Sequence, residues 1–155
     1  MPARALGLHG HGTRTRLQLG PPGLYGPPEE TLLTVRRYQC RRCSAVLVVA
    51  PRDVLPFLRY RARAVVMALA YLADGQASPW IRQRVSAQKI LGDEGRRCWR
   101  CPARWAVRAA ALWPQIRAGP GGDARALALT AVRALASRAP CPTGRLVDDA
   151  VSALG

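Results

Sequence analysis

Two cysteines, Cys40 and Cys43, stand between two apolar segments and limit what the first part of the chain can form. Residues 31–40 (TLLTVRRYQC) are rich in β-branched and aromatic residues with partial alternation, and residues 44–51 (SAVLVVAP) form an apolar run that ends at a proline. Short runs of this kind, bounded by turn residues, are typical of β-strands. The sequence therefore predicts a strand, a turn that carries two cysteines, and a second strand.

A turn of this kind can direct two thiolates toward one metal ion, and zinc is the metal that suits them. Cys40 and Cys43 are the candidate zinc ligands, and strand, turn and strand outline half a zinc ribbon. In such a ribbon the metal replaces the hydrophobic core that a short hairpin cannot build. A structural zinc site needs about four ligands, so a metal-free pair remains an open alternative beside two ways to complete the site. The residues available for completion are Cys98 with Cys101, or His9 with His11.

Most of the remaining chain is predicted to be helical, so we expect a mainly α fold with a small β element. In more detail, we expect a partial zinc-ribbon-like β hairpin followed by a helix-turn-helix bundle and carboxy-terminal helices. Apolar spacing, prolines and glycines predict helices over residues 61–75, 78–86, 102–116, 124–138 and 144–154. The expected domains are a poorly ordered Gly/Pro/Arg-rich segment (1–30), the hairpin (31–56), the helix-turn-helix domain (57–118) and a helical extension (119–155).

The net charge indicates a polyanionic partner. The chain has 24 Lys and Arg against 9 Asp and Glu, which gives a formal charge of +15. Such an excess attracts phosphates, so double-stranded DNA is the expected partner. Arg100, Arg104 and Arg108 are spaced to share one helix face, as a recognition helix needs. The expected DNA-binding residues are Arg36, Arg37, Arg41, Arg42, Arg97, Arg100, Arg104 and Arg108.

Catalysis is not expected. The acidic residues are scattered, both histidines lie near the amino terminus, and no glycine-rich loop ends in Lys-Ser or Lys-Thr. No apolar run approaches the roughly 18 residues of a membrane span, and the first residues lack the apolar stretch of a signal peptide. We expect a cytoplasmic, nucleoid-associated protein with no membrane and no small-molecule substrate as partners; a homodimer is left open.

Four segments appear in an order that matches a known pattern: LHGHGTRTR, RRYQCRRCSAVLVVAPRDVLP, RYRARAVVMALAYL and CWRCPARWA. This order resembles uncharacterised zinc-ribbon plus helix-turn-helix proteins related to the amino-terminal DNA-binding part of insertion-sequence transposases. The resemblance covers roughly residues 7–113, and Trp99 and Trp105 have the spacing of its recognition helix. It implies that Cys40 and Cys43 are the second ligand pair, and that a first Cys-x-x-Cys, missing here, would lie upstream. The catalytic domain of such transposases is absent, so DNA binding is the activity that the resemblance implies.

Three other interpretations remain open from the sequence. The chain can be a structural or interaction protein of helices, dimeric and without affinity for DNA. It can be a non-functional transposase remnant. It can also be a thiol redox protein that uses Cys98 and Cys101, in which case the pKa of one of these thiols is expected to be lowered.

Overall fold

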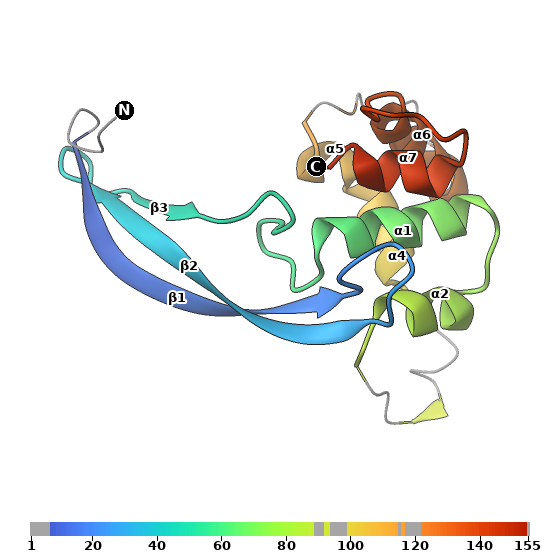
Figure 1. Ribbon diagram of the computed structural model, residues 1–155, viewed down its shortest axis with the longest axis horizontal. Helices are drawn as coiled ribbons and strands as arrows, with labels where there is room; N and C mark the ends of the chain where they lie inside the picture. The colour runs from blue at the N-terminus through green and yellow to red at the C-terminus, as the bar shows by residue number, and fades with distance from the viewer. Residues whose placement is uncertain (1–6, 89–91, 94–98, 115, 117–121, 155) are drawn as a thin grey trace.

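The computed structural model describes residues 7–88, 92–93, 99–114, 116 and 122–154. Strands β1 (Leu8–Gly20), β2 (Glu29–Cys40) and β3 (Val46–Val49) form an antiparallel sheet in the order β1-β2-β3. This sheet is a long, twisted ribbon that projects from a group of packed helices (Figure 1). The helices are α1 (Ala62–Ala73), α2 (Ser78–Val85), α4 (Cys101–Val107), α5 (Ala109–Leu112), α6 (Ala124–Ala136) and α7 (Leu146–Ser152).

The fold is mixed α/β, so the expectation of a mainly α protein with a small β element is wrong. Helices make up 39% and strands 24% of the residues that the structure describes. The difference arises from β1, which lies in the Gly/Pro/Arg-rich segment that the composition predicts to be poorly ordered. It pairs with β2 from Leu8 opposite Cys40 to Gly20 opposite Glu29, so its backbone groups are satisfied by another segment rather than by local structure. Within that segment, residues 21–28 form the loop that joins the two strands.

The predicted strand, two-cysteine turn and strand are confirmed. Strands β2 and β3 pair from Gln39 opposite Val46 to Arg36 opposite Val49; Cys40 is the last residue of β2, and Cys43 lies in the turn that follows. Each side chain of β3 is at least 42% exposed. This part of the sheet is therefore an arm that reaches into solvent and has no core of its own.

Helix α1 is the centre of the helical part. Its residues 64–70 are all buried, and it packs against α2, α4, α6 and α7. Small side chains, among them Ala128 and Ala131 of α6, fill much of the core. The predicted helices are confirmed with one change: the helix expected over 102–116 is two shorter helices that meet at Arg108, and the second ends before Pro114. A residue that precedes proline is disfavoured in helical conformation, which explains this end.

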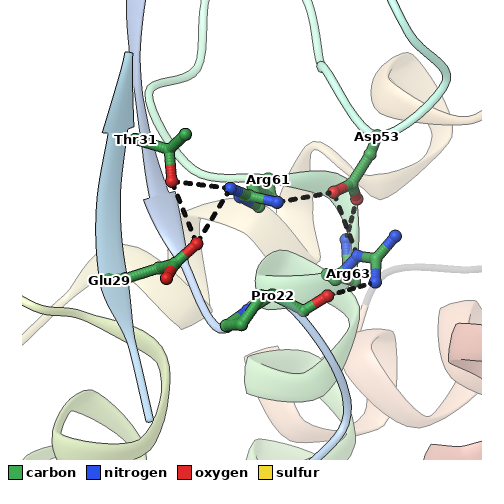
Figure 2. A network of polar contacts seen from close by, with 6 residues as sticks. All are labelled: Pro22, Glu29, Thr31, Asp53, Arg61 and Arg63. Atoms are coloured by element: carbon green, nitrogen blue, oxygen red, sulfur yellow. Dashed lines mark hydrogen bonds and ion pairs between the residues drawn. The ribbon is translucent and has the colours of Figure 1, made fainter. Parts of the chain in front are cut away.

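Two arginines at the start of α1 join the ribbon to the helices (Figure 2). The side chain of Arg63 donates to the carbonyl of Pro22 at 2.7 Å and to the carboxylate of Asp53 at 3.0 Å. Arg61 donates to the hydroxyl of Thr31 at 2.8 Å. Asp53 also accepts the backbone N–H of Arg63 at 3.1 Å, which satisfies a donor in the first turn of α1. Loop, ribbon and helix are thus held in one arrangement.

Candidate nucleic-acid interface

The four arginines predicted on the ribbon lie near its free end. Arg41 and Arg42 are exposed in the two-cysteine turn, and Arg36 and Arg37 follow one another on β2. Successive residues of a strand point to opposite faces, so these last two cannot meet the same surface. Among the residues that the structure describes, none of the four has an acidic partner within ion-pair distance. Their charges are therefore available to solvent and to ligands.

A second group of arginines lies along α4. Arg100 precedes the helix, Arg108 follows it, and both are exposed together with Arg104. At about 1.5 Å per residue, the row extends over roughly 12 Å. On the buried side of α4 lies Trp105, which is 5% exposed. Arg97, also predicted to contact DNA, lies outside the described residues.

Aromatic packing sets the orientation of α4. The ring of Trp105 meets Tyr60 edge to face, with 4.9 Å between centroids, and meets Trp99 at 5.5 Å. Such pairs add to the free energy of burial because ring edges and faces carry opposite partial charges. The packing keeps the tryptophan side of α4 inward and leaves the row of arginines to solvent.

The two groups of arginines do not form one surface. Figure 1 shows the free end of the ribbon at one extremity of the molecule, whereas α4 lies among the helices at the other. A ligand that contacts both groups must therefore be long, or must reach them separately.

The cysteine turn lowers the pKa of the Cys40 thiol but brings together few metal ligands. Backbone N–H groups of Cys43 and Arg42, and the side chain of Cys43, donate hydrogen bonds that lower the pKa of Cys40. Within the described part of the chain, no three His, Cys, Asp or Glu side chains come together as a metal site. His9 and His11 thus do not complete a site with the two cysteines, and Cys98 lies outside the described residues. Two ligands do not fit a structural zinc ion.

The structure gives no support to a redox role for Cys101. Burial raises the pKa of this thiol, and the charge of Arg104 and a hydrogen bond with Trp99 offset that effect only in part. Reactive thiols have a lowered pKa. The Cys101 side chain is instead a partly buried thiol that packs against the hydrophobic core.

The sequence reasoning missed a basic hollow beside the ribbon. It has a volume of about 540 Å³ and lies between β1, β3 and the loop of residues 50–57. Alternation of Thr and Arg at positions 13–16 is a signal that could have revealed part of it. The hollow is lined by Arg14, Arg16, Arg52, Phe57, Val48 and Pro56, among others.

Comparisons of the chain with protein-family models, with curated proteins and with solved structures find no match. The resemblance to transposase-related proteins therefore stays an expectation from the sequence. Among the helices that the structure describes, none is long and apolar enough to cross a bilayer.

Proposed function

We propose that this protein binds double-stranded DNA without catalysing a reaction on it. The observation that carries the proposal is the row of exposed arginines, Arg100, Arg104 and Arg108, along α4, whose Pro102, Trp105 and Ala106 are buried. A short helix with its apolar side anchored and its basic side free can lie in the major groove. Guanidinium groups there can contact phosphates or the edges of guanines.

The ribbon supports binding in a different way. Its exposed arginines have no ordered arrangement on one face, so they suit phosphate contacts, which position a protein on DNA without reading bases. The net charge of +15 adds a long-range attraction. Binding of this kind is driven by counterion release, and each neutralised phosphate contributes about 0.9 to the slope of log affinity against log salt.

The test compares two double variants with the same change in charge. Arg104→Gln with Arg108→Gln removes two arginines of the row, whereas Arg133→Gln with Arg138→Gln removes two exposed arginines of α6 and its carboxy-terminal end. Binding to a short labelled duplex is followed by fluorescence anisotropy over a range of salt. We expect the salt slope to fall by about 1.8 in the first variant, because two phosphate contacts are lost. In the second variant the slope should change little.

Equal losses in the two variants would mean that only the net charge acts, and that α4 has no special part. No binding by the unaltered protein at low salt would refute the proposal as a whole.

Self-association is a second candidate function, favoured by β3. This strand lies at one edge of the sheet, and Val46, Leu47, Val48 and Val49 are between 42% and 60% exposed. An exposed apolar edge strand offers unpaired backbone groups to a strand from another chain. A second copy that pairs there would extend the sheet.

A further inference from the structure

The basic hollow combines positive charge with an exposed aromatic ring. Arg14 and Arg52 are exposed at its rim, and their side chains have no hydrogen bond or ion pair with any residue of the described ranges. Phe57 is 100% exposed, although phenylalanine is among the residues that most often enter a core. A fully exposed ring beside free guanidinium groups indicates a ligand with both an aromatic face and negative charge.

Phe57 is held in place by the structure around it. The side chain of Arg16 donates to the carbonyls of Leu55 and Leu58, at 3.3 and 3.1 Å, and so ties the chain on both sides of the ring. Phe57 itself has a φ of +61°, a conformation that non-glycine residues rarely adopt. Strained residues of this kind persist only where the surrounding structure enforces them, and they are concentrated at functional sites.

The rest of the loop is equally well anchored. Asp53, near its start, accepts hydrogen bonds from both the backbone and the side chain of Arg63 (Figure 2). The backbone carbonyl of Asp53 also accepts a hydrogen bond from the backbone N–H of Ala62, at 2.8 Å. Because the loop is fixed at residues 53, 55 and 58, the backbone that carries the ring is held in place, and a loop ordered before binding lowers the entropic cost of binding.

We infer that the basic hollow binds an unpaired base of a nucleic acid strand. Phe57 stacks on the base, and Arg14 and Arg52 neutralise the phosphates on either side. The volume of about 540 Å³ lies within the range of pockets that hold a small organic group. A base inside a duplex is already stacked on both faces, so it must leave the stack before it can meet the ring. The inference rests on the proposed affinity for nucleic acid and adds a preference for a single-stranded segment.

The experiment measures affinity for a labelled single-stranded oligonucleotide and for a duplex of the same sequence, with the full chain at constant salt. Phe57→Leu keeps an apolar side chain but removes the aromatic face. We expect it to weaken single-strand binding by about tenfold, the effect of one lost stacking contact, and to leave duplex binding unchanged. Phe57→Tyr keeps the ring and should bind like the unaltered protein.

Leu32→Ala is the matched control. This leucine is 72% exposed on the same ribbon, and its position next to Leu33, which shares a face with Arg16, places it on the opposite face. Its loss should not affect either ligand. Arg14→Gln and Arg52→Gln should each reduce the salt slope of single-strand binding by about 0.7, and circular dichroism checks that each variant is folded.

The other outcomes are decisive against the inference. Unchanged single-strand affinity in Phe57→Leu would overturn it, and so would an equal loss for single strand and duplex, which would mean that the ring contacts paired DNA. Duplex binding without single-strand binding by the unaltered protein would overturn the inference and leave the proposed function standing. Absence of both would refute the two together.

Discussion

Phe57 is the residue at which local stability and the proposed binding oppose each other. Its φ of +61° and full exposure mean that the ring contributes little to the fold while its backbone is strained. A left-handed conformation costs a non-glycine residue roughly 1–2 kcal/mol. Glycine avoids this strain but has more freedom in the unfolded chain.

Replacement of this residue by glycine should therefore stabilise the protein. We expect Phe57→Gly to raise the free energy of unfolding by about 0.5–1 kcal/mol, the relief of strain less the added entropy of the unfolded chain. Urea denaturation measures the change. Leu32→Gly is the control, because Leu32 is an exposed apolar residue in a regular strand, and there glycine should destabilise. A loss of stability in both variants would contradict the prediction.

At the scale of elements, the contact between β1 and α1 depends on one glycine. Gly20 has a φ of +133°, and a Cβ atom there would lie 2.5 Å from the Cβ of Ala64. An alanine would have to push the strand away from the buried helix. We expect Gly20→Ala to lower the free energy of unfolding by about 2–4 kcal/mol, from backbone strain and overpacking together.

Gly10→Ala is the control in the same strand. Nothing lies within 4 Å of a Cβ atom at Gly10, so this variant should keep nearly the full stability in the same urea experiment. If the two alanine variants were equally stable, the close approach of β1 to α1 would not exist in solution.

The carboxylate of Asp149, in α7, holds the loop that leads into this helix. This group accepts hydrogen bonds from the backbone N–H and hydroxyl of Thr143, at 2.6 and 2.8 Å, and from the backbone N–H of Gly144 at 3.2 Å. The bonds to Thr143 are the main reason that the pKa of Asp149 is lowered. The ionised form is therefore favoured by folding.

The pH dependence follows from this direction. A lowered pKa in the folded state stabilises the protein fully above the ordinary aspartate pKa of about 3.9, and that stability is lost as the pH falls through the folded value. We expect Asp149→Asn to be less stable than the unaltered protein at neutral pH, and the difference to shrink below about pH 4. Urea midpoints from neutral to acid pH measure it. A constant difference would show that ionisation of Asp149 does not matter.

At the scale of the whole molecule, net charge opposes association through the exposed edge strand. The charge of +15 repels a second copy of the chain. The exposed apolar edge of β3, in contrast, favours pairing with a second copy. Salt screens the repulsion, since the Debye length falls from about 10 Å at 0.1 M to about 3 Å at 1 M. We therefore expect self-association to increase with salt, while DNA binding decreases.

Sedimentation over a range of salt checks this prediction. Val48→Lys places a charge on the edge strand and should keep the protein monomeric at high salt, because a lysine on an edge strand hinders pairing with another chain. A monomer under all conditions, or association that Val48→Lys does not prevent, would exclude β3 as the contact.

Sequence patterns were reliable where a feature depends on neighbouring residues. The two-cysteine turn between β2 and β3 was predicted from the residues beside it, and α1 and α6 were predicted from apolar spacing. The burial of Trp105 and the exposed row of α4 arginines also follow from helical periodicity. The short break at Arg108 was not predicted, and the spacing of the residues contains no signal for it.

The sequence by itself thus determined the local elements and the basic character of the protein, because periodicity, turn residues and net charge are properties of short stretches or of composition. Only the tertiary structure decided that residues 8–20 form a strand, because their hydrogen-bond partners lie in β2. It also decided that Arg61 and Arg63 have structural roles. The basic hollow likewise exists only after folding, because residues far apart in the chain, such as Arg14 and Phe57, come together only when ribbon and loop pack.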